Sequence, residues 1–118
     1  MSFRYEELNV CKDIQELILE IYKITTSFPA DERFGLTTQA RRAGTSILLN
    51  IAEGSARRTP KEFSRFITYS LGSVTESHSV MKMALSLGFI TQVQYDAFSI
   101  KAENLWRRLC ALRASQRE

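Results

Sequence analysis

Apolar side chains recur at intervals of three and four residues along four long segments of this sequence, which is the spacing of one helix face. The segments cover residues 6–26, 36–56, 59–87 and 91–114 and take up most of the 118 residues. The chain has only five glycines and two prolines, so a sandwich or barrel with many tight turns is disfavoured. We therefore expect a single all-α domain over residues 1–118, folded as an up-down-up-down four-helix bundle.

The ends of the expected helices carry recognisable local signals. Phe28-Pro29 ends the first helix, because the residue before a proline avoids the helical conformation. Thr59-Pro60-Lys61-Glu62 and Thr91-Gln92-Val93-Gln94 are capping boxes that start the third and fourth helices. Gly54 is a candidate exit glycine for the second helix, and Gly88 fits the stop of the third.

The third predicted helix carries a second row of apolar side chains beside its core stripe. A four-helix bundle needs only one stripe per helix, so the second row requires another partner. Large apolar residues that cluster on one surface indicate self-association. Five residues of this second row and a tryptophan of the fourth predicted helix form the candidate oligomer interface. The six residues are Phe66, Tyr69, Val80, Met83, Leu87 and Trp106.

Polar residues interrupt these apolar faces at four positions. Asn50 and Glu53 lie in the second predicted helix, and Ser73 and Glu76 lie in the third. Buried polar groups need hydrogen-bond partners, and antiparallel packing would bring the two pairs to similar heights. We therefore expect a structural network that fixes the register of the two helices. Two glutamates without a nucleophile or metal ligand are weak support for catalysis.

The sequence offers few residues for catalysis or metal binding. His78 is the one histidine, and a lone histidine is more often structural than part of a catalytic triad. Cys11 and Cys110 form no CxxC motif, and we expect two free thiols near the same end of the bundle. We therefore predict no catalytic residue, no metal site and no cofactor.

Targeting signals are also missing from the sequence. No run of 18 apolar residues is present, and the first residues lack the apolar stretch of a signal peptide. These observations predict a cytoplasmic protein without a membrane partner.

Basic residues are concentrated in the later part of the chain. Residues 1–40 carry four basic and seven acidic side chains, whereas residues 41–118 carry twelve and six. The formal net charge is +3. An excess of this kind, most of it arginine, indicates a polyanionic partner, although solvated helix faces explain the same charge.

The junction between the second and third predicted helices is the strongest candidate anion site. The N-terminus of the third helix would add free backbone N–H groups and the positive end of the helix dipole. We predict a weaker second site at Arg41 and Arg42, at the other end of the bundle. In the alternative interpretation, the junction arginines only cap the second helix and pair with Glu53 or Glu62. The main predicted nucleic-acid site consists of Arg57, Arg58, Lys61 and Arg65.

Several short motifs occur together along the chain, and they resemble one protein family. They are Ser46-Ile47, Asn50-Ile51-Ala52-Glu53-Gly54, Arg57-Arg58, Lys61-Glu62-Phe63, Phe66-Ile67, and Leu71-Gly72-Ser73 followed by Glu76. With these motifs and Phe3-Arg4-Tyr5-Glu6-Glu7-Leu8 near the start, the sequence resembles the bacterial 23S rRNA-intervening-sequence proteins, also called four-helix bundle proteins. One departure is Leu48, where many members have a proline after Ser-Ile.

This resemblance implies a cyclic homopentamer without catalytic residues. It also implies kinship with the accessory variability determinant protein of diversity-generating retroelements, which works with a reverse transcriptase. The leading hypothesis is therefore a non-enzymatic, homo-oligomeric protein that binds RNA or DNA, with RNA favoured, through a basic surface of the ring. The alternative is a scaffold that binds a protein partner without nucleic acid.

Overall fold

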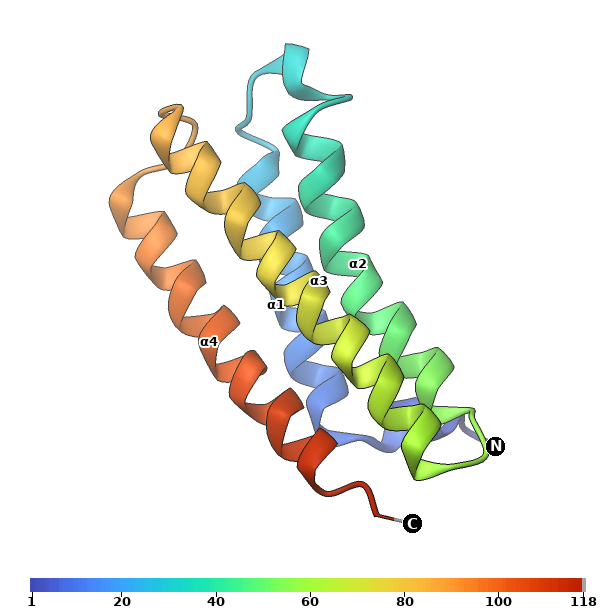
Figure 1. Ribbon diagram of the computed structural model, residues 1–118. Helices are drawn as coiled ribbons and strands as arrows, with labels where there is room; N and C mark the ends of the chain where they lie inside the picture. Colours follow the sequence, from blue (N-terminus) through green and yellow to red (C-terminus); the bar gives the residue numbers. More distant parts are fainter. Residues whose placement is uncertain (118) are drawn as a thin grey trace.

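A computed structural model, which describes residues 1–117, shows an all-helical protein (Figure 1). No strand occurs among the residues it describes. Two short 3₁₀ helices, η1 (Arg4–Glu7) and η2 (Ala30–Glu32), precede the first two long helices. The prediction of an all-α protein with four long helices is confirmed. These helices are α1 (Asn9–Thr25), α2 (Leu36–Ser55), α3 (Pro60–Ser86) and α4 (Gln92–Ala114).

Successive helices run in opposite directions, as the predicted topology requires (Figure 1). Each helix packs against two neighbours, so that α1 and α3 both contact α2 and α4. The resulting bundle measures 47 × 23 × 22 Å. The N-terminus and the end of α4 lie at the same end of the bundle as the α2–α3 connection, and we call it the lower end (Figure 1).

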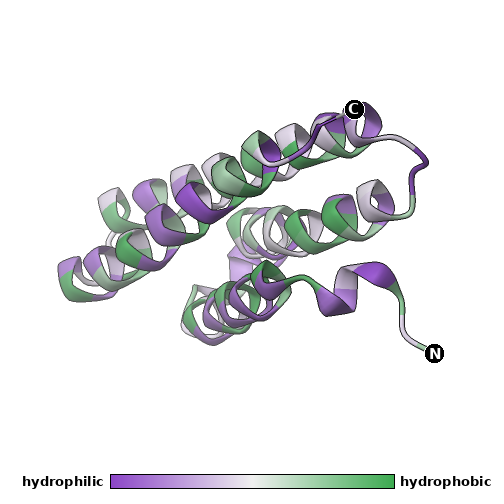
Figure 2. Cartoon of the chain, turned by 90° about the horizontal axis from the view of Figure 1, so that it is seen from below, coloured by the Kyte–Doolittle hydropathy of each residue, from purple (hydrophilic) through white to green (hydrophobic). Residues whose placement is uncertain are grey.

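The predicted apolar stripes form one hydrophobic core between the four helices. Figure 2 shows that each helix carries hydrophobic and hydrophilic residues on different sides. Burial of large side chains such as these contributes about 1.5–3 kcal/mol each to folding. The largest apolar side chains that are almost fully buried are Ile14, Leu17, Ile21, Ile47, Ile51, Phe63, Ile67, Met81, Phe98, Leu105 and Leu109.

The first helix starts later than the sequence pattern suggests. Arg4–Glu7 forms the separate helix η1, and Leu8 is extended (φ −77°, ψ 130°) before α1 begins. The Glu6 carboxylate accepts a hydrogen bond from the Phe3 backbone N–H at 2.9 Å, which stabilises this separate turn. The first buried residue is Val10, so the apolar stripe of α1 begins only after the break.

The local signals at the ends of α3 and α4 act as predicted, except that the capping box at Thr59 is only half formed: the described structure has no return hydrogen bond from the Glu62 side chain. The Thr59 hydroxyl accepts a hydrogen bond from the Glu62 N–H, with Pro60 at the first helical position. Thr91 and Gln94 form a complete capping box at the start of α4. Gly88 has a positive φ of 78° just after α3, where the N–H of the next residue reaches back to the Ala84 carbonyl at 2.8 Å.

Gly54 has a different role from the predicted exit glycine. It lies inside α2, which ends at Ser55 and is followed by Ala56, a cap residue with ordinary helical geometry. A Cβ atom on Gly54 would lie 2.5 Å from the Phe66 Cβ and 3.0 Å from the Phe63 ring. Gly54 therefore allows α2 and α3 to approach closely, and a larger residue would push the two helices apart.

The length and hydropathy of the described helices can be compared with those of a membrane-spanning helix. None of them has an apolar stretch that is long enough to span a bilayer.

Candidate nucleic-acid interface

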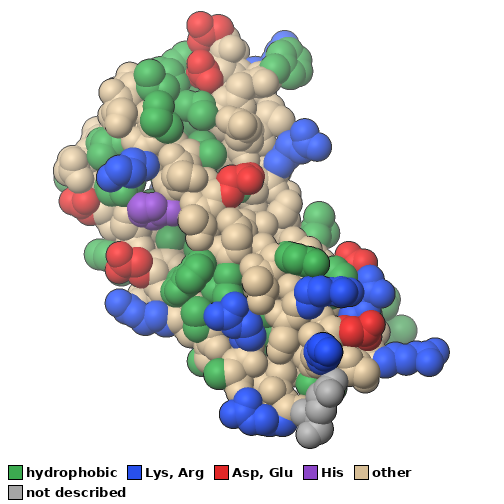
Figure 3. Space-filling model, viewed as in Figure 1, with side chains coloured by type: hydrophobic (Ala, Val, Ile, Leu, Met, Phe, Trp, Pro, Cys, Tyr) green, Lys and Arg blue, Asp and Glu red, His purple; other side chains and the backbone are tan. Residues whose placement is uncertain are grey.

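Four predicted cations meet at the lower end of the bundle, and we call them the basic junction: Arg57, Arg58, Lys61 and Arg65. The two arginines of the pair follow the end of α2, and the other two cations lie one turn apart at the start of α3. Figure 3 shows Lys and Arg side chains gathered around this end of the molecule. The fold therefore brings the predicted cations into one region.

Two of these arginines flank a phenylalanine of α3. The Arg57 guanidinium lies 4.8 Å from the centre of the Phe66 ring, and that of Arg65 lies 5.7 Å from it. Arg57 also pairs with Glu53, with 2.7 Å between Nη2 and Oε1. The capping interpretation is therefore correct for Arg57, whose charge is partly balanced by its neighbour.

The other three cations of the junction differ from Arg57 in their surroundings. Among residues 1–117, Arg58, Lys61 and Arg65 take part in no ion pair, and all three are exposed. Glu62, the second predicted partner of the arginines, takes part in none either. These three side chains therefore present positive charge to solvent without internal neutralisation.

The start of α3 contributes fewer backbone donors than predicted. Pro60 has no N–H, and the Glu62 N–H donates to the Thr59 hydroxyl at 3.1 Å. The Phe63 N–H donates to the Thr59 carbonyl. In this first turn, the Lys61 N–H is the backbone donor left for a ligand. An anion at the junction would therefore be held mainly by side chains.

Sequence reasoning missed two further arginines at this end. The Arg4 guanidinium lies 5.0 Å from the centre of the Phe63 ring and donates to the Ser55 carbonyl at 3.2 Å. It thereby caps the end of α2 from the N-terminal segment. Arg113 of α4 donates to the Thr68 hydroxyl of α3 at 3.2 Å. An up-down-up-down topology places the N-terminal segment and the end of α4 at the same end as the α2–α3 connection. The predicted topology could therefore have indicated that both arginines lie near the junction.

The weaker predicted site near the start of α2 divides into two different roles. The Arg41 Nε donates to the Thr25 hydroxyl at 3.0 Å, and the guanidinium lies 4.7 Å from the centre of the Tyr22 ring. Arg41 thereby ties α2 to the end of α1. Arg42 is exposed and has no ion pair among the described residues. Only Arg42 remains available as a surface cation.

The predicted polar network between α2 and α3 is not formed, because its residues have other hydrogen-bond partners. The Asn50 amide donates to the Ser46 carbonyl of its own helix at 2.9 Å. The Glu53 carboxylate pairs with the guanidinium one turn later. In the described chain the side chains of Ser73 and Glu76 make no hydrogen bond to α2. These residues therefore do not fix the register of the two helices.

A buried serine provides the polar link that these residues do not. The Ser70 hydroxyl of α3 donates to the Ile47 carbonyl of α2 at 2.8 Å, and Ser70 is completely buried. Ser70 lies within the apolar stripe of α3, between Ile67 and Val74. A buried hydroxyl in the middle of an apolar stripe needs a hydrogen-bond partner. The position of Ser70 in the stripe was therefore the sequence signal for this link between the two helices.

The six residues of the candidate oligomer interface do not form one surface. Phe66 and Val80 are each only 7% exposed and belong to the core of the chain, so they already have partners. Tyr69, Met83 and Leu87 are about half exposed, on the side of α3 that faces α2 by helical position.

Trp106 lies apart from those residues. It lines a depression of about 180 Å³ between α3 and α4, together with His78 and Glu103. Sequence spacing shows which residues share one side of a helix, but it does not show which neighbouring helix that side faces. For this reason Trp106 of α4 was grouped with residues of α3 that lie elsewhere.

A second apolar surface lies between α1 and α2, and we call it the α1–α2 patch: Ile18, Leu19, Leu48 and Leu49. It lines a depression of about 550 Å³. Leu19 and Leu49 are 69% and 63% exposed, which is high for large aliphatic side chains. Leu48 is thus part of a surface on an unbroken α2.

Two of the remaining titratable groups, His78 and Cys11, have well-defined surroundings. The described residues include no group of three or more His, Cys, Asp or Glu side chains that could hold a metal ion. The His78 Nε2 lies 2.8 Å from the Ser99 hydroxyl and 3.3 Å from the Tyr95 hydroxyl, a hydrogen-bonded link between α3 and α4. Burial, with a contribution from the Glu6 carboxylate, raises the pKa of the Cys11 thiol, which keeps it protonated and unreactive.

Comparisons with known proteins place this geometry in context. The model of the 23S rRNA-intervening sequence protein family matches residues 6–111. A crystal structure of a protein of unknown function from the S23 ribosomal protein family of Bacteroides thetaiotaomicron has a TM-score of 0.78 to this fold. The two sequences are 21% identical, and the similarity covers 88% of this chain and 97% of that one. A search of curated proteins found no match.

The structural similarity supports the four-helix fold, and nothing in these comparisons points to enzymatic activity. The family match extends over nearly all of the described helices, including the whole of the basic junction. By this match, the chain belongs to the 23S rRNA-intervening sequence protein family.

Proposed function

We propose that this protein is a non-enzymatic, homo-oligomeric nucleic-acid-binding or accessory protein that acts on RNA through the basic junction. The observation that carries the proposal is a trio of exposed cations, Arg58, Lys61 and Arg65, for which residues 1–117 supply no ion-pair partner. Unneutralised cations at one end of a rigid bundle suit contact with a phosphate backbone. The family name, which refers to sequences within ribosomal RNA genes, is consistent with RNA as the ligand.

The proposed contact is to the backbone rather than to the bases. Lys61 and Arg65 lie four positions apart on one helix and point to the same side of it. The Phe66 ring is almost fully buried and flanked by two guanidinium groups, so it offers no free face for stacking a base. Binding of this kind positions a nucleic acid without reading its sequence.

Self-association would repeat the junction around a ring. The α1–α2 patch and the exposed residues Tyr69, Met83 and Leu87 lie on adjacent sides of the bundle, with α2 between them. Head-to-tail contact between two different surfaces closes a ring when the surfaces meet at an angle, and forms a filament when they are opposite. Adjacent sides of a four-helix bundle suit a small ring, and the resemblance to the family favours five copies.

The nucleic-acid proposal is tested by binding across a salt series. Replacing Arg58, Lys61 and Arg65 by alanine should weaken binding to single-stranded RNA. Each lost phosphate contact should also reduce the slope of log affinity against log salt by about 0.7–0.9. A matched control replaces three exposed basic residues away from the lower end, Lys23, Arg33 and Lys82. Unchanged affinity and slope in the junction variant would show that the nucleic-acid surface, if any, lies elsewhere.

The oligomer proposal has its own measurement. Leu19→Glu with Leu49→Glu, and separately Tyr69→Glu with Met83→Glu, place charges on the two surfaces without touching the buried core. Each pair should reduce the molar mass measured by light scattering to that of a monomer while the helical circular dichroism is kept. A wild-type protein that is monomeric at micromolar concentration would contradict this part of the proposal.

A second candidate function is a scaffold for a protein partner, and the α1–α2 patch favours it. Four aliphatic side chains on one open surface suit a hydrophobic partner surface as well as a second copy. The resemblance to the retroelement accessory protein makes a reverse transcriptase one partner to test. Association with that enzyme in the absence of nucleic acid, without salt-dependent RNA binding by the protein alone, would favour the scaffold.

A further inference from the structure

The depression between α3 and α4 contains the one tryptophan of the chain, and we call it the tryptophan depression. Trp106 and Glu103 of α4 line it together with Thr75 of α3. Its volume of about 180 Å³ is large enough for a single nucleobase. Trp106 is 40% exposed, and the proposed ring contacts do not use this surface. Figure 3 shows this face of the molecule, where hydrophobic side chains lie next to Lys and Arg side chains.

The tryptophan depression is continuous with the basic junction along α3. Lys61, Thr68 and Thr75 follow one another at intervals of seven residues, so they lie on one side of the helix. Lys61 belongs to the basic junction, and Thr75 lines the depression about 21 Å further along the helix axis. Gly72 lies between the two threonines, where a Cβ would meet nothing within 4 Å. The surface between the junction and the depression is therefore open.

Arg113 supplies a cation between the basic junction and the tryptophan depression. It follows Trp106 by two turns of α4, so the two residues lie on the same side of the helix, about 10 Å apart along its axis. Its guanidinium donates to the Thr68 hydroxyl of α3 at 3.2 Å, which holds it over the open surface. Among residues 1–117, no carboxylate pairs with Arg113. Its remaining N–H groups suit a phosphate.

Glu103 limits which part of a nucleic acid can enter the tryptophan depression. Its carboxylate is exposed and takes part in no ion pair among the described residues. A carboxylate repels a phosphate, but it accepts hydrogen bonds from the N–H groups of a base. An RNA strand would therefore enter the depression with a base and keep its phosphates near Arg113.

We propose that the tryptophan depression holds one unpaired base of an RNA strand whose phosphates contact the basic junction. The base stacks on the Trp106 ring, and the backbone passes Arg113 over the open surface at Gly72. Stacking on an aromatic ring tolerates every base but needs one that is free of its partner strand. The contact therefore selects single-stranded RNA without reading its sequence. This inference rests on the proposed function, because it extends the same surface.

The first test uses the fluorescence of Trp106, the one tryptophan of the chain. The full chain is titrated with single-stranded oligoadenylate, with an abasic ribose-phosphate chain of the same length, and with duplex RNA. Anisotropy of a dye on each ligand measures binding itself. Only the single-stranded RNA should quench the fluorescence saturably, because only it has a base free to stack on the ring. Equal quenching by the abasic chain, or RNA binding without quenching, would overturn the inference.

The second test compares variants at exposed positions, with circular dichroism to verify that each is folded. Trp106→Ala should weaken binding of the single-stranded RNA about tenfold, and Trp106→Phe should keep most of the affinity, because it keeps a ring. Neither change removes a cation, so the slope of log affinity against log salt should stay that of the wild type. Phe34→Ala removes an exposed aromatic ring between η2 and α2, and this matched control should bind like the wild type.

The results of these variants separate the inference from the proposed function. Salt-dependent RNA binding that Trp106→Ala weakens no more than Phe34→Ala would overturn the inference and leave the proposed function intact. Weaker binding with a shallower salt slope would show that Trp106→Ala loses a phosphate contact rather than a base contact, which also contradicts the inference. A wild-type protein that binds no RNA would overturn both.

Discussion

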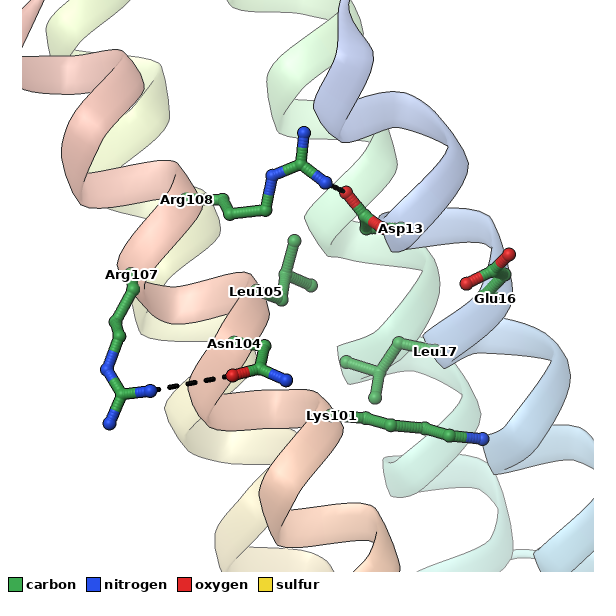
Figure 4. Close-up of a pocket in the computed structure, with 8 residues that line it drawn as sticks. All are labelled: Asp13, Glu16, Leu17, Lys101, Asn104, Leu105, Arg107 and Arg108. Atoms are coloured by element: carbon green, nitrogen blue, oxygen red, sulfur yellow. Dashed lines mark hydrogen bonds and ion pairs between the residues drawn. The ribbon is translucent and has the colours of Figure 1, made fainter.

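The α2–α3 and α1–α4 seams of this bundle are built on different principles. Between α2 and α3, the absence of a side chain at Gly54 lets the helices approach, and a buried hydroxyl, Ser70, links them. Between α1 and α4, two partly exposed ion pairs, one of them drawn in Figure 4, cross a groove lined mostly by polar and charged residues. The comparison teaches that shape and a satisfied hydrogen bond define the first seam, whereas the second is held by charges that water and salt can weaken.

The largest effect should come from filling the space at Gly54. A Gly54→Val substitution places atoms where Phe66 and Phe63 already lie, so α2 and α3 must separate. We expect a loss of about 3 kcal/mol in the free energy of unfolding, measured by urea denaturation. Gly72→Val is the control, because a Cβ there meets nothing within 4 Å. A variant at position 54 that is no less stable than the control would contradict the close approach.

A smaller effect is expected from the buried hydroxyl of the same seam. Ser70→Ala removes the hydrogen bond to the Ile47 carbonyl, which keeps its helical bond within α2. The free energy of unfolding should fall by about 1 kcal/mol. Ser79→Ala, which removes an exposed hydroxyl that bonds only within α3, should cost less. Equal losses in the two variants would show that Ser70 is no special link.

The α1–α4 seam should respond more weakly and depend on salt. A double-mutant cycle with Asp13→Asn and Arg108→Gln should give a coupling of about 0.5 kcal/mol at low ionic strength, because both side chains are partly exposed. The coupling should shrink towards zero in about 1 M salt, where charges are screened within about 3 Å. A coupling that is large and independent of salt would place this pair in the same class as the α2–α3 contacts.

The smallest effect is expected for Asn50, although the sequence pattern first suggested a larger one. Its amide bonds only to the Ser46 carbonyl one turn earlier, and alanine has a higher helix propensity than asparagine. Asn50→Ala should therefore change the free energy of unfolding by no more than about 0.5 kcal/mol. Thermal melts can measure this change. A loss of stability as large as that of Ser70→Ala would show that Asn50 has a structural role between the two helices.

The parts of this fold that the sequence predicts are those set by neighbouring residues. The capping residues Thr59 and Thr91, the stop at Gly88 and the apolar stripes all act within a few turns of one helix. The role of Gly54 could not be predicted, because it depends on which α3 residue lies opposite. For the same reason, the hydrogen bond of Ser70 was missed.

The candidate site follows the same division. The basic junction is contiguous in sequence, so its cations could be predicted as a group. Arg4 and Arg113 join it only through the fold, since they come from the two distant ends of the chain. Trp106 was grouped with α3 residues because periodicity ranks residues within a helix and does not say which neighbour each side faces.

The two ion pairs between α1 and α4 have a consequence for the order in which the bundle assembles. Their partners are 81 and 95 positions apart in the chain, whereas α2 and α3 are joined by the short connection Ala56–Thr59. Closing such a long loop costs entropy before any contact forms across it. We therefore expect the α2–α3 hairpin to form before the α1–α4 seam closes. In native-state hydrogen exchange, separation of α1 from α4 should then require less free energy than separation of α2 from α3.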